Sequence, residues 1–108
     1  MNTLKKRRAE MVEYQDSPSE LEKLYFTLGH DIAYINECLG DFYKTVQEVK
    51  IKIEPEYKSV AAQDRAFELT EEFLLLKQYK HTLAGLECLR GAIYVKLKGL
   101  KAEAKGQY

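Results

Sequence analysis

Residues 17–55 read SPSELEKLYFTLGHDIAYINECLGDFYKTVQEVKIKIEP, and this stretch decides the fold. Its apolar residues recur at alternating spacings of four and three: Leu21, Tyr25, Leu28, Ile32, Ile35, Leu39, Phe42, Val46, Val49 and Ile53. This spacing is typical of the buried seam of a left-handed coiled coil or a long helical bundle. We therefore expect one helix over residues 18–54 that buries the seam against a neighbouring helix.

The two ends of this helix carry their own sequence signals. Ser17 is a helix-capping residue, Pro18 suits the first helical position, and Glu20 completes a capping box. The helix should end at Glu54, because Pro55 disfavours helical geometry in the residue before it. The predicted segments are a basic N-terminal segment at 1–16, helix one at 17–54 and a link at 55–58.

A second helix is predicted over residues 59–104, with Ser59 as its cap. Its seam runs through Ala62, Ala66, Leu69, Phe73, Leu76, Tyr79, Leu83, Leu86, Arg90, Ile93, Leu97 and Leu100. The spacing is three on both sides of Leu76, a stammer that should bend or overwind the pair. The link is too short for the second helix to run parallel to the first. We therefore expect a long antiparallel, coiled-coil-like hairpin. With a tail at 105–108, residues 1–108 should form a single all-α domain.

Composition is that of a soluble globular protein. Apolar residues make up 45% and charged residues 31%, which is too apolar for disorder and too charged for a membrane protein. No stretch approaches the roughly 18 apolar residues of a membrane span, and no apolar region follows Lys5-Lys6-Arg7-Arg8 as in a signal peptide. Cys38 and Cys88 lack a CxxC spacing, which is typical of free thiols in a reducing compartment. We expect a cytoplasmic protein with no membrane partner.

Sequence motifs for catalysis and cofactor binding do not occur. The phosphate-binding patterns GxxxxGK[ST] and GxGxxG are absent from the sequence. Neither His30 nor His81 is followed at three or four positions by a His, Cys or carboxylate that would complete a metal pair. Paired acids such as Glu71-Glu72 are typical of a solvated helix face. We expect no enzyme activity, no catalytic residues, no cofactor and no metal site.

Basic residues gather in two clusters that flank the predicted hairpin. The clusters are Lys5, Lys6, Arg7 and Arg8 before helix one, and Lys96, Lys98, Lys101 and Lys105 at the end of helix two. An antiparallel hairpin would bring them to one end, near Tyr94 and Tyr108, where cations and rings hold phosphates and stack bases. Lysines at a helix C-terminus also offset the helix dipole, and they would pair with the acidic first half of helix one. Both interpretations remain open.

A second apolar stripe on helix two predicts self-association. Every seventh residue from Val60 belongs to it: Val60, Phe67, Leu74, His81, Cys88 and Val95. This stripe lies off the seam, and contiguous exposed apolar patches usually mark interfaces. We expect a homo-oligomer whose interface contains Phe67, Leu74, Leu75 and Val95. Alternatively, a third helix over residues 3–15 could cover the stripe with Leu4, Met11 and Val12.

Aromatic residues off the seam point to a further contact. Tyr34, Tyr43 and Tyr94 are the candidates for contact with a protein partner, since exposed aromatic side chains are enriched at interfaces. The stretch from Tyr79 to Lys98, with a tyrosine, spaced Leu and Ile, and terminal lysines, resembles the C-terminal helix of small helical phage recombination mediators. Any long amphipathic helix shares these features, so no site residue is transferred from that resemblance.

These observations lead to three functional hypotheses. The first is a non-enzymatic, self-associating helical interaction protein of adaptor or inhibitor type, in the style of small phage-encoded inhibitors. The second is a nucleic-acid-associated accessory factor that uses the basic end. The third is a binder that sequesters a small anionic ligand at an oligomer interface, with the same lysines and tyrosines. The second and third hypotheses require the lysine cluster for activity, whereas the first does not.

Overall fold

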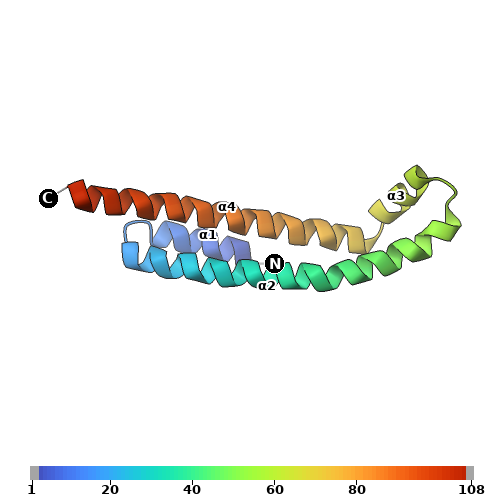
Figure 1. The fold of residues 1–108 in the computed structure, drawn as a ribbon, viewed down its shortest axis with the longest axis horizontal. Coiled ribbons are helices and arrows are strands. Elements are labelled where there is room, and N and C mark those ends of the chain that lie inside the picture. Colours follow the sequence, from blue (N-terminus) through green and yellow to red (C-terminus); the bar gives the residue numbers. More distant parts are fainter. Residues whose placement is uncertain (1–2, 107–108) are drawn as a thin grey trace. The chain divides into compact units, whose positions relative to one another are not determined.

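The computed structural model describes residues 3–106, with side chains through residue 103. Within this range every regular element is helical and no strand occurs. The elements are α1 (Thr3–Glu13), α2 (Pro18–Ile53), the 3-10 segment η1 (Glu54–Glu56), α3 (Val60–Glu68) and α4 (Glu71–Gly106) (Figure 1). The all-α class is confirmed, and α2 begins and ends within one residue of the predicted bounds.

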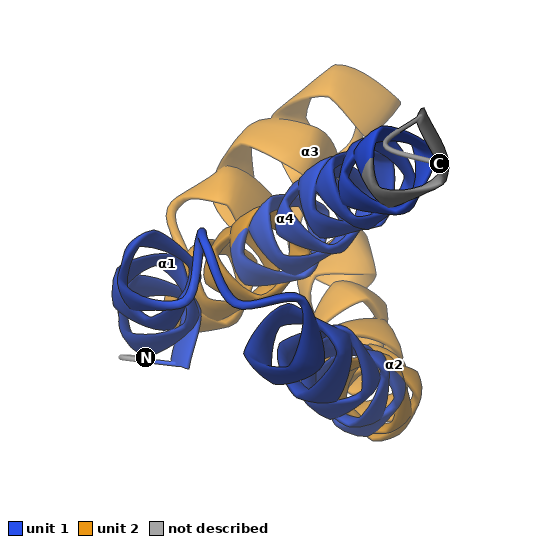
Figure 2. Ribbon diagram, turned by 90° about the vertical axis from the view of Figure 1, so that its left-hand side faces the viewer, with its two compact units in different colours: residues 1–34, 82–108 blue, residues 35–81 orange. Residues whose placement is uncertain are grey.

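The helices form two compact units (Figure 2). In the described chain, unit 1 contains α1, the part of α2 up to Tyr34 and the part of α4 from Thr82. Unit 2 contains residues 35–81, which include the rest of α2, η1, α3 and the start of α4. The single domain expected over residues 1–108 stays a prediction.

Unit 1 is built on large aliphatic side chains of α2 and α4. Leu21 and Leu28 of α2 and Leu86 and Ile93 of α4 are fully buried. The two segments run antiparallel within this unit, because Tyr25 contacts Tyr94 while Gly29, one turn later in α2, lies beside Arg90, one turn earlier in α4. Burying a leucine or isoleucine fully contributes about 1.5–3 kcal/mol each, so these four residues anchor the unit.

Helix α1 turns back along α2 after the turn at residues 14–16 (Figure 1). Its buried residue is Leu4, which lies against Gly85 of α4. Val12 remains exposed, as does Val95 of α4, which is 69% exposed. A third helix therefore forms where the sequence suggested one, but it does not cover the stripe residue Val95.

Unit 2 buries the seam of α2 beyond Tyr34. Ile35, Leu39 and Val46 are buried, and Phe42, Val49 and Ile53 are partly covered. Phe42 contacts the ring of Tyr79 of α4, with 5.6 Å between ring centroids. The seam predicted from alternating spacings is thus the covered side of this segment.

The predicted second helix is divided, contrary to the expectation of one helix over residues 59–104. α3 ends at Glu68 and α4 begins at Glu71. The Thr70 hydroxyl donates to the Phe67 carbonyl (2.6 Å) and accepts from the Phe73 amide (3.2 Å), so it closes α3 and caps α4. Leu69 was assigned to the seam by its spacing, but it lies in this junction and is 88% exposed. Local capping therefore overrides the apolar pattern here.

The same division changes the environment of Phe67. This residue was predicted at an exposed oligomer interface, but it is only 8% exposed. Its ring packs edge-on against Phe73 at 5.5 Å, and the Lys50 ammonium lies 5.0 Å from the ring centroid. Because α3 stops before Leu69, the seven-residue repeat does not continue from α3 into α4, and Phe67 joins the interior of unit 2. Its assignment to an exposed stripe was wrong.

No helix in the described residues combines the length and the apolar character that a membrane crossing requires.

Candidate functional site

Two adjoining hollows lie between α2 and α4 in unit 1. One, of about 390 Å³, is lined by Tyr25, Ile32, Glu87, Arg90, Gly91 and Tyr94. The other, of about 350 Å³, is lined by Glu22, Tyr25, Phe26, Tyr94, Leu97, Lys98 and Lys101. Because both include Tyr25 and Tyr94, we treat them as one surface, the aromatic cleft. Volumes of this size fall within the range of ligand sites, about 300–1,000 Å³.

Three rings form the centre of the aromatic cleft. Tyr25 packs edge-on against Phe26, with centroids 6.0 Å apart and an interplanar angle of 76°. Tyr25 also contacts Tyr94 of α4 at 6.3 Å and 38°. Tyr25 lies on the seam and is partly covered, whereas Phe26 and Tyr94 are 61% and 54% exposed. The cleft is therefore an open groove in which two accessible rings contact a partly covered third ring.

Arg90 of α4 lies at the inner side of this cluster. Its guanidinium carbon is 4.4 Å from the centroid of the Tyr25 ring, a favourable cation–π distance. On α2, the guanidinium lies beside Gly29, where an added Cβ would meet its Nη2 at 3.4 Å, an ordinary van der Waals contact. Tyr25 and Gly29 are one helical turn apart, and the Arg90 guanidinium lies next to both. The Arg90 Nε is buried and has no hydrogen-bond partner in the described part of the chain.

The cleft lining carries both signs of charge. Arg90, Lys98 and Lys101 supply three positive groups, and Glu22 and Glu87 supply two negative ones. The lining therefore has one positive charge in excess, with carboxylates next to the cations. This distribution favours a ligand with a single anionic group over a highly charged polymer.

Of the predicted C-terminal basic cluster, Lys98 and Lys101 line the cleft beside Tyr94. Lys96 is half-buried and belongs to neither lining. The side chain of Lys105 and the whole of Tyr108 lie outside the described residues. The structure therefore supports a local pairing of two lysines with exposed rings.

The N-terminal basic cluster does not join these lysines, contrary to expectation. Because α1 folds back, Leu4 lies at Gly85 and Arg7 binds Asp31, whereas Lys98 and Lys101 lie beside Glu22 and Phe26. Lys5, Lys6 and Arg8 are exposed on α1. The prediction that both clusters lie at one end followed from the antiparallel pairing of helix one with helix two, whereas α1 turns back along α2 and carries its basic residues away from that end.

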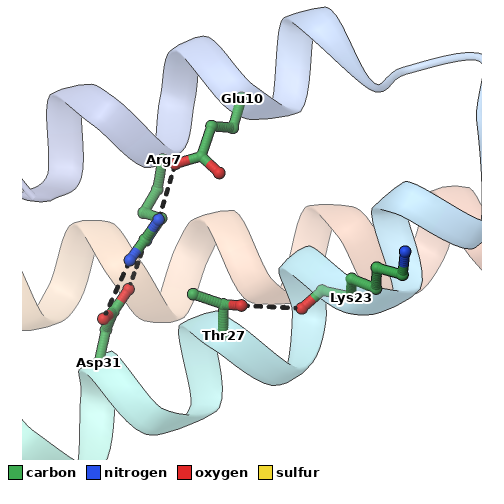
Figure 3. Close-up of polar contacts among 5 residues, drawn as sticks. All are labelled: Arg7, Glu10, Lys23, Thr27 and Asp31. Atoms are coloured by element: carbon green, nitrogen blue, oxygen red, sulfur yellow. Dashed lines mark hydrogen bonds and ion pairs between the residues drawn. The ribbon is translucent and has the colours of Figure 1, made fainter.

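Arg7 is used to attach α1 to α2 (Figure 3). Its Nε donates to Asp31 Oδ2 (2.6 Å), its Nη2 donates to Asp31 Oδ1 (3.4 Å), and its Nη1 donates to Glu10 Oε1 (2.7 Å). The hydrogen bond with Asp31 is the main cause that raises the pKa of Arg7, against an opposing effect of burial. Arg7 therefore has a structural role, and its charge is already matched by two carboxylates.

The three predicted partner-contact tyrosines do not form one site. Tyr34 is exposed in unit 1, outside both linings of the cleft. Tyr43 is exposed in unit 2, where the Lys80 ammonium lies 6.0 Å from its ring centroid. Tyr94 alone of the three lines the aromatic cleft.

Sequence reasoning missed Phe26, Gly29 and the role of Arg90. Arg90 was placed on an apolar seam, and this position was itself a sign of a special role. A charged residue within a buried seam needs a partner that compensates its charge. Gly29 in the middle of helix one was a second signal, because glycine costs about 1 kcal/mol there relative to alanine. The residues that Gly29 and Arg90 contact depend on the register between α2 and α4, which the sequence does not show.

Groups of three or more His, Cys, Asp or Glu side chains that would hold a metal do not occur in the described residues. Cys38 is half-buried, Cys88 is exposed, and both are free thiols. Comparisons with protein-family models, with curated proteins and with solved structures found no significant match to this chain.

Proposed function

We propose that this chain is a non-enzymatic helical interaction protein, of adaptor or inhibitor type, that self-associates and binds another macromolecule through exposed faces of α2 and α4. A long antiparallel hairpin is the arrangement that we propose for the chain as a whole. The observation that carries the proposal is that both helices leave large apolar and aromatic side chains exposed.

These side chains occur in each unit. In unit 1, Phe26, Tyr94 and Val95 are exposed, and Val95 directly follows Tyr94 on α4. In unit 2, the neighbours Leu74 and Leu75 are 57% and 41% exposed. Each such side chain forgoes up to roughly 1.5–3 kcal/mol of burial, and adjacent exposed apolar residues usually mark an interface.

The composition of the aromatic cleft supports binding in preference to catalysis. Among the described residues, its lining contains no histidine, cysteine, serine or threonine. It does contain two tyrosines and an arginine, residue types that dominate the binding energy of protein interfaces. We therefore assign partner binding to the cleft and self-association to the exposed leucines of α4.

Sedimentation equilibrium across the micromolar range tests self-association. We expect a mass above the 12.5 kDa of one chain, and Leu74→Glu should reduce it to that value while the helical circular dichroism is retained. Gln78→Glu adds the same charge one turn later at an exposed polar position and should leave the mass unchanged. Phe67→Glu should instead destabilise unit 2, because it places a carboxylate in the interior. A wild-type mass of 12.5 kDa throughout would contradict self-association.

A specific observation also favours a second candidate, a nucleic-acid-associated accessory factor. Lys98 and Lys101 border the exposed rings of Phe26 and Tyr94, and cations beside accessible rings bind single strands. A binder of a small anionic ligand would use the same groups. Glu22 and Glu87 in the same lining weigh against a polyanion, so protein binding remains the leading proposal.

A further inference from the structure

Among the described residues of unit 1, no carboxylate forms an ion pair with Arg90. In the described part of the chain, the ion pairs are those of Arg7 with Glu10 and Asp31 and that of Lys23 with Glu20. Glu87 lines the same cleft one turn earlier in α4, yet it forms no ion pair with Arg90. The Arg90 Nε is buried without an acceptor, whereas native proteins normally satisfy such groups.

The position of the Arg90 guanidinium is already set. The Tyr25 ring covers it at 4.4 Å, and it lies beside Gly29 on α2. A stacked guanidinium offers a rigid, planar set of donors that matches a carboxylate. Holding it in place before binding reduces the entropy lost when an anion is bound.

Exposed rings lie beside this cation. Tyr94 lines the cleft together with Arg90, and Phe26 continues the apolar lining toward Leu97. Both rings are more than half exposed, so they can contact a further aromatic side chain. The cleft thus places one anion-binding group next to an aromatic contact surface.

The charges around the cleft decide between partner classes. A nucleic acid would bring successive phosphates toward Glu22 and Glu87, and like charges at close range oppose binding. A single carboxylate on Arg90 brings only one negative charge near Glu87, and the one positive charge that the lining has in excess offsets it. The open form of the cleft suits a segment of another chain.

We infer that the aromatic cleft binds a segment of a partner protein in which an aromatic residue adjoins a single carboxylate, with the carboxylate on Arg90 and the ring on Tyr94 and Phe26. This inference rests on the proposed function and names the chemistry of its partner.

The test is a pair of blocked dipeptides, N-acetyl-Phe-Asp-amide and its neutral counterpart N-acetyl-Phe-Asn-amide. Each is titrated into the full-length, isotope-labelled protein, and NMR follows the Arg90 Nε–H signal and the ring signals of Tyr25, Phe26 and Tyr94. We expect the Asp peptide to shift all four groups and to bind about tenfold more tightly than the Asn peptide, since a hydrogen bond to a charged group is the stronger one.

Two variants separate the roles of cation and ring. Arg90→Lys keeps the charge but loses the planar donor set, so it should abolish most of the tenfold preference for Asp. Arg8→Lys, an exposed arginine of the same unit, is the matched control and should leave both affinities unchanged. Tyr94→Ala removes an exposed ring and should weaken both peptides by a similar factor. Because Tyr94 is exposed, this variant remains informative even if Arg90→Lys fails to fold.

Three outcomes would overturn the inference. One is that neither peptide shifts the cleft signals, and another is that both bind equally well. The third is that a short oligothymidylate shifts the same signals more strongly and with a steep salt dependence, which would assign the cleft to nucleic acid. Self-association is measured separately by sedimentation. If the protein is an oligomer but binds neither peptide, this inference is wrong and the proposed self-association still holds. If the protein is a monomer that binds the Asp peptide, only the proposed self-association is wrong.

Discussion

Leu4 of α1 occupies the space that the missing side chain of Gly85 leaves on α4. A Cβ added to Gly85 would lie 2.5 Å from Leu4 Cδ2 and 3.0 Å from Leu4 Cδ1. Leu4 is the buried residue of α1, and the pair therefore sets the position of this helix in unit 1.

Gly85→Ala should loosen the packing of the start of α1 without unfolding the rest of unit 1. The new methyl group requires the end of the Leu4 side chain to move, while α4 gains up to about 1 kcal/mol of helix propensity. We expect faster amide hydrogen exchange in α1 and little change in the free energy of unfolding. Gly99→Ala has no atom within 4 Å of the added Cβ, so it should stabilise α4 and leave exchange in α1 unchanged. Equal exchange in α1 for both variants would contradict this role of Gly85.

Asp31→Asn should lower the free energy of unfolding by about 1–2 kcal/mol, because it removes charged hydrogen bonds to a partly buried Arg7. Glu20→Gln, in a more exposed pair with Lys23, should cost under ~0.5 kcal/mol. Urea unfolding measures both variants. A similar loss for both would mean that burial does not strengthen the Arg7 pair.

The pH dependence of this pair follows from the raised pKa of Arg7. A group whose pKa is raised on folding contributes stability that is fully present below its unfolded pKa and is lost as the pH rises through the folded one. For an arginine both values are strongly alkaline. The difference between wild type and Asp31→Asn should therefore stay constant from neutral to mildly alkaline pH in urea melts. A difference that falls steadily over this range would assign the effect to another group.

Thr70→Ala should cost about 1 kcal/mol, since the Thr70 hydroxyl caps α4 and bonds the last turn of α3. Thr70→Ser keeps the hydroxyl and should recover most of this stability. Thr45→Ala, at an exposed position inside α2, is the control and should change stability by under ~0.5 kcal/mol. Thermal melts of the three variants give the comparison, and an unchanged melting temperature for Thr70→Ala would show that the junction does not depend on this cap.

Replacing Lys98 and Lys101 by Gln tests the nucleic-acid candidate. If these lysines contact two phosphates, the slope of log affinity against log salt should become shallower by about 1.4 for a single strand. The same change at Lys5 and Lys6 of α1 should leave the slope unchanged, because these residues are not part of the cleft lining. Gel shifts in which the wild type binds no single strand even at ~50 mM salt would remove this candidate.

Local signals were sufficient for most helix boundaries. Ser59 caps α3 as predicted, with its hydroxyl accepting from the Ala62 amide at 3.1 Å. The junction at Thr70 was also encoded locally, since Thr70 followed by Glu71 and Glu72 is a helix start signal. The apolar spacing through Leu69 competed with this signal. Capping prevailed because Leu69 gains no burial in the structure, whereas Thr70 satisfies backbone groups at both helix ends.

The site was predictable only in part. The sequence identified Lys98, Lys101 and Tyr94 as neighbours, because they lie within two turns of one helix. The sequence did not show that α1 packs back along α2. That arrangement depends on the packing of Leu4 against Gly85 and on the hydrogen bonds between Arg7 and Asp31. These contacts join residues that are far apart in the chain.

What the sequence by itself determined is the all-α class, the extent of α2 and most of its buried side, since periodicity and capping act over a few neighbouring residues. Leu24, which is buried but lies off the predicted seam, is the exception among the buried residues of α2. What only the tertiary structure decided is the aromatic cleft. Arg90 meets Tyr25 and Gly29 because of the register between α2 and α4, and that register follows from how Leu21, Leu28, Leu86 and Ile93 pack together. Close packing is a property of many side chains at once, and no local pattern specifies it.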